Sequence, residues 1–414
     1  MANNIKFFTS LNMNAPSLSN DWGVLIDILD ACLVTGYGSQ PVASIGVENG
    51  IAIVTFNSLH GLQQFQVIEL SGADQPEFNG EFKILGVGAT TIEFSIEVPD
   101  QVATGTISCK VAPLGWDKKF SGTHKAVYQA KDKTLNPYFL RVDNSLDPLY
   151  TANYAKYGKV GILESCTGID DLTGRQAPFS EDEPTRNWIA TESGLRVKNG
   201  WFKWQYAVHE SSAISSSFYE SEGATNGNRL WMLIGDDSGF FIIPHATVNN
   251  FLAIPYGFCC IQHGEKSKPY LFATNRWASA GSNNLCETPL GKSELISAAC
   301  LYDHNNQAAN TRFSSLTPGM KSNIVDISSG VATNNIKVDP LDGHMLTPFY
   351  VLDPNNYLIG KLPMIHFCVN DASTLPDKTP FNIGNDYFIS CRYRNTAGGV
   401  IGSLFVKLHE GGLL

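Results

Sequence analysis

The stretch that decides the fold begins ASIGVENGIAIVTFNSLHGL at residues 43–62 and runs on to Pro113. Residues 46–57 alternate apolar side chains with small or polar ones, with a turn at Glu48-Asn49-Gly50, which is typical of strands. Asn79-Gly80 is a strong hairpin signal. Four further runs of the same kind follow, at residues 66–70, 82–87, 91–98 and 105–111. We therefore expect residues 43–113 to form a small β-barrel or β-sandwich domain.

This small domain is predicted to interrupt a larger one. Without it, Gly36-Tyr37-Gly38-Ser39 would run on into Gly115-Trp116-Asp117-Lys118. Inserted domains usually join at exposed loop tips, and Gln40-Pro41 and Pro113-Leu114-Gly115 mark the two joins. We predict an N-terminal arm and helix that belong to the main body (1–42), the inserted module (43–113) and the main β-rich body (114–414). The main body is optionally divided into two subdomains, 114–300 and 301–414.

A single amphipathic helix is predicted near the N-terminus. Its apolar residues recur at helical spacing, Ser19 or Asn20 can cap its start, and Gly36 stops it. With one apolar face, the helix is expected to pack on the β core downstream. The apolar residues are Trp22, Leu25, Ile26, Leu29, Cys32 and Leu33.

The body from residue 114 onward is predicted to be β-sandwich-like with long decorating loops, because short strand patterns and turns follow one another with almost no helical period. The sharpest hairpin is residues 229–243, and a short helix is expected at 245–251. Further strands are expected at 125–129, 138–142, 254–262, 269–272, 349–352, 357–361, 364–369, 387–393 and 402–408, and loops at 165–182, 211–228 and 275–289. The predicted fold class is mainly β.

Composition excludes several classes of function. Charged residues are only 16% of the chain and the formal net charge is -10. With no basic run, the chain is not expected to bind nucleic acid. No apolar stretch is long enough to span a bilayer, and the first residues lack a signal-peptide pattern, so we expect folding in the cytoplasm and no membrane partner. The nine cysteines lack a framework spacing and are expected to be reduced and buried.

Few residue patterns suggest catalysis. Gly235-Asp236-Asp237-Ser238-Gly239 superficially resembles a serine-protease nucleophile loop, yet Asp, Ser and Gly are also turn residues, and we favour a β-turn. Asp170-Asp171 and Glu181-Asp182-Glu183 could form a glycosidase pair only if folding brought them together. We favour solvated loops for both.

Metal ligands are equally sparse. Asp303-His304 and His366 near Cys368 are the nearest to ligand pairs, and Asp339-Pro340-Leu341-Asp342-Gly343 lacks the closing ligands of a calcium loop. His366 is expected in a core strand. We predict no catalytic, metal-binding or cofactor-binding residue, no cofactor, and no enzyme activity.

Aromatic residues gather between Trp188 and Tyr206. They could line a sugar-binding groove together with the loop up to Asn228, since aromatic rings stack on sugars. Core packing is the favoured interpretation, because large aromatics dominate burial energetics.

Residues 47–111 resemble a small β module recurrent in tailed-phage structural proteins. One departure is Gln63-Gln64-Phe65, where the module usually has a Gly-Asp-like turn. The matching segments are His60-Gly61-Leu62, Val67 to Asp74, Phe78-Asn79-Gly80-Glu81-Phe82, Thr90-Thr91-Ile92-Glu93-Phe94 and Ala103-Thr104-Gly105-Thr106-Ile107.

The flanks resemble a family of uncharacterised phage virion proteins through Leu29 to Ser39, Gly115 to Tyr128 and Phe139 to Asp143, and more loosely through Trp231 to Ile242. In that family the insert is optional. The resemblance implies a place in the virion, without any known activity to carry over.

The expected function is therefore that of a structural component of a tailed-phage virion, in the tail, neck or baseplate. It would act through contacts with other virion proteins, as a homo-oligomer in a ring or shell. The alternatives are a head decoration protein or a receptor-binding or glycan-binding virion module. A cell-wall hydrolase is the least favoured.

Overall fold

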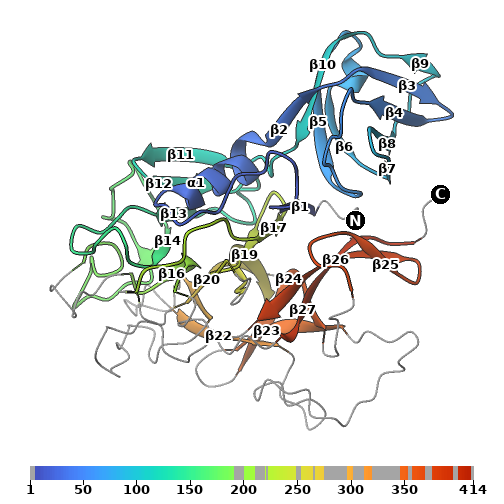
Figure 1. The fold of residues 1–414 in the computed structure, drawn as a ribbon. Coiled ribbons are helices and arrows are strands. Elements are labelled where there is room, and N and C mark those ends of the chain that lie inside the picture. The colour runs from blue at the N-terminus through green and yellow to red at the C-terminus, as the bar shows by residue number, and fades with distance from the viewer. Residues whose placement is uncertain are drawn as a thin grey trace.

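The computed structural model contains a mainly β fold with one short α-helix near the N-terminus, as predicted (Figure 1). Its described strands form four sheets with antiparallel pairing, and none of these sheets closes into a barrel. The described residues are 5–190, 200–209, 220, 222–248, 253–263, 266–274, 296–301, 312–318, 346–352, 357–368, 375–394 and 400–411.

The largest sheet has twelve strands and runs through the body in the order β1-β17-β18-β19-β20-β21-β22-β23-β24-β27-β26-β25. It folds over on itself, because β19 also contacts β24, which is not its neighbour in the sheet. Both halves contribute side chains to one hydrophobic cluster. The strands are β1 Lys6–Thr9, β17 Trp231–Gly235, β18 Phe240–Pro244, β19 Tyr256–His263, β20 Lys266–Ala273, β21 Ser297–Cys300, β22 Arg312–Pro318, β23 Leu346–Leu352, β24 Leu358–Cys368, β25 Phe381–Ile383, β26 Asp386–Arg394 and β27 Val400–His409.

Strands β17 and β18 are buried on both faces, which explains their unbroken apolar sequence. Trp231 and Leu233 belong to one cluster, whereas Met232 and Ile234 belong to the other. A strand covered on both faces offers no position for a solvated side chain. The predicted hairpin at residues 229–243 is confirmed.

A second sheet of six strands covers the other face of this layer. Trp204 connects this sheet to the twelve-stranded one, because its indole N–H donates to the carbonyl of Phe272 in β20 at 2.8 Å. The predicted loop at 165–182 includes β15, so that assignment is partly wrong. The strands are β11 Asp117–Gly122, β12 Lys125–Gln129, β13 Phe139–Asp143, β14 Lys156–Leu163, β15 Gln176–Ala177 and β16 Lys203–Ala207.

The N-terminal helix starts later than predicted. Helix α1 spans Val24–Leu29 and continues as a π-helical turn, η1, over Asp30–Thr35, ending at Gly36 as expected. Neither Ser19 nor Asn20 caps it. The side-chain oxygen of Asn144 instead accepts from the backbone N–H groups of Gly23 at 2.9 Å and Leu25 at 3.2 Å. A residue distant in sequence therefore fixes the start of the helix.

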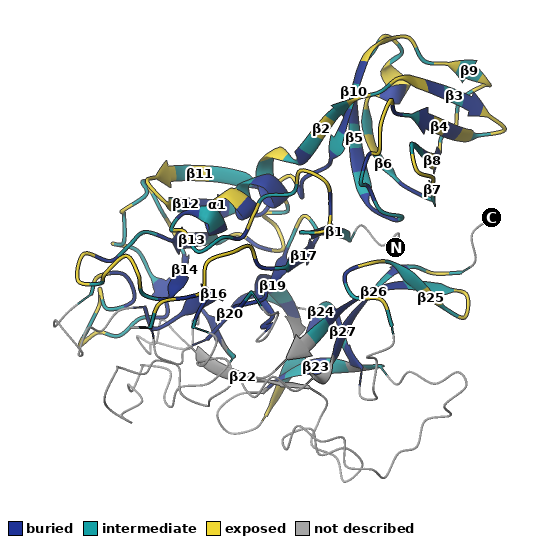
Figure 2. Ribbon diagram, viewed as in Figure 1, coloured by how far each residue is buried: buried dark blue, intermediate teal, exposed yellow. Residues whose placement is uncertain are grey.

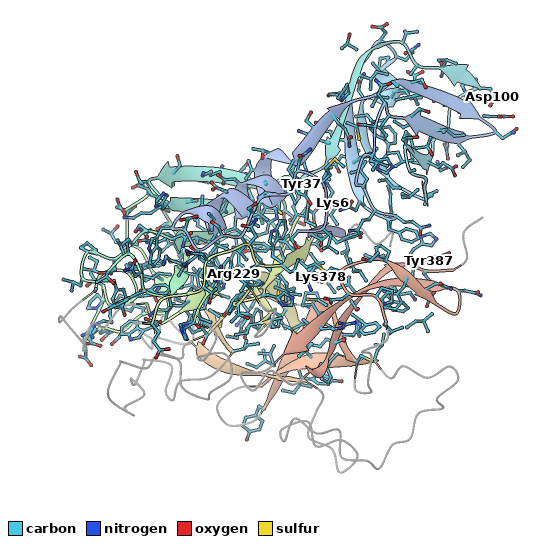
Figure 3. All side chains as sticks on the ribbon, in the orientation of Figure 1. Lys6, Tyr37, Asp100, Arg229, Lys378 and Tyr387 are labelled. Carbon is cyan, nitrogen blue, oxygen red and sulfur yellow. The ribbon has the colours of Figure 1, made fainter. Side chains whose placement is uncertain are left out.

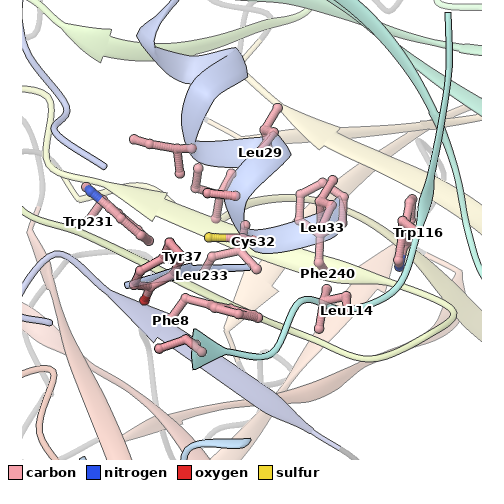
Figure 4. Packing of buried hydrophobic residues seen from close by; sticks show 14 of the residues in the cluster. Phe8, Leu29, Cys32, Leu33, Tyr37, Leu114, Trp116, Trp231, Leu233 and Phe240 are labelled. Carbon is pink, nitrogen blue, oxygen red and sulfur yellow. The ribbon is translucent and has the colours of Figure 1, made fainter. Parts of the chain in front are cut away.

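The apolar face of this helical segment packs on the body, as its amphipathic pattern predicts. Figure 4 shows Leu29, Cys32 and Leu33 among Trp231 and Phe240 of the central strands. The first strands of the body and the helix thus share one core.

Residues 37–111 form two smaller sheets that project from the body (Figure 1). The four-stranded sheet has the order β2-β10-β5-β6 and the five-stranded one β7-β8-β4-β3-β9. The strand β9 is too short to show an alternating pattern, and the sequence did not indicate it. The elements are β2 Tyr37–Pro41, β3 Ser44–Glu48, β4 Ile51–Thr55, β5 Val67–Ala73, η2 Pro76–Phe78, β6 Gly80–Lys83, β7 Gly86–Val87, β8 Thr91–Ser95, β9 Gln101–Val102 and β10 Gly105–Val111.

The chain enters and leaves this module side by side, because β2 pairs with β10 through Gln40 opposite Cys109 and Tyr37 opposite Val111. Between its sheets, the Phe82 and Phe94 rings stack with centroids 4.2 Å apart. Apolar contacts nevertheless continue from the module into the body as one cluster. The assignment of residues 43–113 as a separate inserted domain remains a proposal, as do the boundaries of the body and its subdomains.

The remaining expectations fall partly outside the described residues. His245 pairs with Ala253 in an isolated bridge, and residues 246–248 are not helical, so the short helix predicted there is wrong over this part. The predicted loop at 275–289 lies outside the described residues, as does most of the one at 211–228.

Candidate functional site

The five-stranded sheet of the module presents one face to its own core and one to solvent. Ala52 and Val54 of β4 are buried, whereas Ile51 and Ile53 are 37% and 42% exposed. Val102 of β9 is 65% exposed. The larger side chains therefore face outward, a choice that the alternating sequence alone did not decide. Exposed and buried positions alternate along these strands in Figure 2.

The strand register places the exposed residues in rows on one face. Ile53 lies opposite Gly46 on one side and Glu93 on the other, and Gly46 lies opposite Val102. Ile51 lies opposite Glu48 in the next row. Directly opposite residues point to the same face of a sheet. We call this surface the outer face, made of Gly46, Glu48, Ile51, Ile53, Glu93 and Val102.

Gly46 leaves the centre of the outer face open. A Cβ atom built on it would meet nothing within 4 Å. The surface between Ile53 and Val102 is therefore a bare strip of backbone, which a side chain from another molecule can approach closely.

The module is held to the body at its base. Lys6 of β1 donates to the Glu81 carboxylate at 2.7 Å and to the Pro113 carbonyl. On the C-terminal side of the body, the Phe65 ring stacks on His409 with centroids 5.3 Å apart. Figure 3 shows Lys6 at this base and Asp100 at the opposite end of the module. The outer face is thus carried away from the body.

A cavity of about 280 Å³ lies at the base. Burial lowers the pKa of Lys6 and of Lys83, and burial followed by the nearby Asp236 and Asp132 raises the pKa of Asp237. Three lysines and three carboxylates balance each other around it, so it favours neither a cation nor an anion. The lining residues are Ile5, Lys6, Val67, Glu81, Lys83, Leu114, Lys131, Asp236 and Asp237.

Buried charges gather behind the second sheet. Lys203 and Glu220 are nearly inaccessible, and the ammonium group donates to both carboxylate oxygens at 2.7 and 2.8 Å. Burial lowers the pKa of Lys203, and the charge of Glu220 opposes that shift. Because both side chains are almost fully buried, we assign the pair a structural role.

A second buried group joins β13 and β14. The Lys159 ammonium lies 3.5 Å from Asp147 and 3.8 Å from Asp143, and the Arg141 guanidinium lies 3.6 Å from Asp143. The guanidinium also lies over the Trp188 ring, 4.4 Å from its centroid. Neither group could be expected from the sequence, because a lysine or arginine in a strand ordinarily indicates a solvated position.

The stretch at residues 235–239 is a turn, as favoured. The Asp236 carboxylate accepts from the backbone N–H groups of Ser238 at 2.8 Å and Gly239 at 2.9 Å, and from the Ser238 hydroxyl at 2.8 Å. The Ser238 hydroxyl is engaged within its own turn, which is the arrangement of a structural turn residue and not that of a serine activated by a separate base.

The acidic candidates also have local partners. Asp170 pairs with Lys125 and Arg141, which lowers its carboxyl pKa. Asp171 accepts from the hydroxyl groups of Thr167 and Thr173 at 2.6 and 2.7 Å. Glu183 pairs with Arg186 within its own loop. Among the described residues, no hydrogen bond or ion pair joins the two acidic segments.

His366 lies in β24 and is half-buried instead of enclosed in the core, and burial lowers its pKa. Cys368, which follows closely in the same strand, is buried. The candidates at Asp303-His304 and at residues 339–343 lie outside the described residues. Among those that are described, no three His, Cys, Asp or Glu residues come together as a metal site.

The described aromatic residues between 188 and 206 are buried. Trp188, Trp201 and Tyr206 are each less than a tenth exposed, which agrees with core packing. Their ring faces are therefore not available to stack on a sugar in this arrangement.

Eight of the nine cysteines lie among the described residues. The cysteines there are all free, and most of them are buried; Cys166 and Cys260 are partly exposed. No helix in the described part of the chain has both the length and the apolar character needed to cross a bilayer.

No family model and no curated protein matches the chain. Among solved structures, it is similar to phage phi92 endosialidase, with a TM-score of 0.16 and 12% sequence identity. The match covers 91% of this chain and 53% of that one, so the chain spans about half the length of that protein. A TM-score this low supports no inference about function.

Proposed function

We propose that this protein is a structural component of a tailed-phage virion, located in the tail, neck or baseplate, and that it acts through protein–protein contacts in a symmetric assembly. The resemblance of residues 29–39 and 115–128 to phage virion proteins supports this proposal, and so does the resemblance of residues 47–111 to a phage structural module. In this proposal residues 43–113 are an inserted domain that other virion proteins contact.

The outer face is the observation that carries the proposal. Isoleucine side chains on a small sheet would be expected in its core, yet Ile51 and Ile53 are exposed, with Val102 close by in the register. Exposed apolar side chains grouped on one surface mark sites of interaction with other proteins. Because the module projects from the body, this surface is accessible to a neighbour.

Mass spectrometry of purified particles tests the proposal. The chain is expected to copurify with the virion through a density gradient. Its copy number should be a multiple of the order of rotational symmetry of the tail, neck or baseplate. Negative-stain labelling with an antibody against the full chain should then mark the tail, neck or baseplate. Particles that lack the chain would rule the proposal out, and label on the head surface would favour a decoration protein instead.

A further inference from the structure

The module carries most of the net negative charge of the chain. Residues 43–113 contain eight Asp and Glu against two Lys, a formal charge of -6 out of the -10 of the whole chain. Both lysines are engaged away from the outer face: Lys110 pairs with Glu69 at 3.1 Å, and Lys83 donates to the Leu408 carbonyl of the body. Within the module, which is fully described, no cation therefore offsets the acids of the outer face.

The acids of the outer face lie next to its apolar residues. Glu48 is directly opposite Ile51, and Glu93 is directly opposite Ile53. Both carboxylates are exposed. Asp100, which accepts from the Asn49 backbone N–H at 2.9 Å, extends the negative charge to the far end of the module. An apolar centre within a charged, solvated rim is the usual anatomy of a protein–protein interface.

We infer that the outer face docks onto a different virion protein, whose surface places Lys or Arg side chains around an apolar centre. Charge complementarity selects this occupant, because opposite charges steer association and like charges in contact oppose it. A second copy meeting the same face would bring Glu48 and Glu93 against identical carboxylates. The inference rests on the proposed function, since it names the chemistry of the partner in the particle.

Photo-crosslinking in intact particles tests the inference. A phage lacking the gene is complemented with the full chain carrying a photoreactive amino acid in place of Val102, the most exposed apolar residue of the outer face. After irradiation, the expected product is a crosslink to another virion protein, within a peptide that contains Lys or Arg beside apolar residues.

A blocking variant and a matched control sharpen the test. Gly46→Trp adds a large side chain where a Cβ meets nothing and the backbone is not left-handed, so the fold should be kept. Gly168→Trp adds the same side chain at an equally open position of the body. The crosslink yield should fall at least tenfold with Gly46→Trp and stay unchanged with Gly168→Trp. Circular dichroism of both purified chains confirms folding.

The charge is tested with Glu48→Gln and Glu93→Gln together. The crosslink yield should fall several-fold, because the steering charge next to the apolar residues is removed while the shape of the surface is kept. A yield equal to that of the unaltered chain overturns the inferred chemistry.

The outcomes distinguish a failure of the proposed function from a failure of the docking inference. If the chain is absent from the particle, the proposed function fails. The inference alone fails if the chain is present but crosslinks to its own copies, to a surface without basic residues, or to nothing.

Discussion

Replacing Glu220 by glutamine should destabilise the body strongly. Lys203 and Glu220 are about 1% and 3% exposed at their side chains. The carboxylate also accepts from the Tyr150 hydroxyl at 3.0 Å and from the Gln205 amide at 3.3 Å. Glutamine keeps the shape of the side chain but leaves the Lys203 charge buried without its partner.

The expected loss follows from that uncompensated charge. Removing one partner of a buried ion pair costs about 3–5 kcal/mol of unfolding free energy. Replacing both residues, as Lys203→Met with Glu220→Met, removes the buried charge, so the remaining loss comes from donors left unsatisfied, about 1–3 kcal/mol for each. The Tyr150 hydroxyl and the Gln205 amide are those donors. Together these two donors cost about 2–6 kcal/mol, a range that overlaps the loss for Glu220→Gln, so the double variant is expected to be destabilised by a similar amount.

Urea unfolding followed by tryptophan fluorescence measures these differences. Trp204 lies on the same strand as Lys203 and is fully buried, so its emission reports unfolding of this region. Glu183→Gln is the control, because the Glu183 side chain is 42% exposed and its pair with Arg186 should contribute no more than about 1 kcal/mol. The reasoning is refuted if Glu220→Gln unfolds within about 1 kcal/mol of the unaltered chain.

The pH dependence gives an independent check on the same pair. Burial lowers the pKa of Lys203 in the folded chain, and the Glu220 charge, which counteracts that shift, is lost in Glu220→Gln. Between the folded pKa and the unfolded value of about 10.5, the unfolded chain binds more protons, so stability rises with pH. The loss of unfolding free energy in Glu220→Gln, relative to the unaltered chain, should therefore shrink as the pH rises toward the unfolded pKa of Lys203.

Three further predictions concern single residues. Asn144→Ala removes the acceptor for the first N–H groups of the helix, among them that of Gly23, and should lower the unfolding free energy by about 1–3 kcal/mol in urea. Burial, with smaller effects of nearby lysines, lowers the pKa of His366 below its unfolded value of about 6.5, so the associated stability is present above that pH and lost as the pH falls through the folded pKa. In His366→Gln the melting temperature should therefore depend less on pH between pH 7 and pH 5, and an unchanged dependence would contradict this. Gly36 has φ 73°, and a Cβ there would lie 2.4 Å from the Val111 carbonyl oxygen, so Gly36→Ala should lower the unfolding free energy in urea by at least about 1–3 kcal/mol. Gly46→Ala is the control, because a Cβ at Gly46 meets nothing within 4 Å and no such loss is expected.

Local patterns in the sequence predicted much of the fold. Most strands of the module and the hairpin at residues 229–243 could be predicted, because alternating side chains and turn residues are decided over a few positions. The end of the helix at Gly36 is also local, since that residue adopts a backbone conformation that other residues rarely adopt.

Features that depend on distant residues could not be predicted. The oxygen that accepts from the first helical N–H groups comes from Asn144, and Glu220 neutralises Lys203 from a separate segment. The folding over of the long sheet likewise depends on contacts between β19 and β24. No local pattern contains this information.

The outer face lies between these two cases. Alternation predicts the strand that contains Ile51 and Ile53, but it does not say which side faces the core. The second sheet of the module, through residues such as Phe82 stacked on Phe94, covers the side with Ala52 and Val54. The exposed isoleucines therefore became evident only once the two sheets were placed together.

Electron cryomicroscopy of the intact particle is the measurement that tests the central claim most directly. We predict density for this chain within the tail, neck or baseplate, with a different protein lying over Ile53 and Val102 and its basic side chains near Glu48 and Glu93. A particle map with no density for the chain, or one in which these residues face open solvent, would contradict the account.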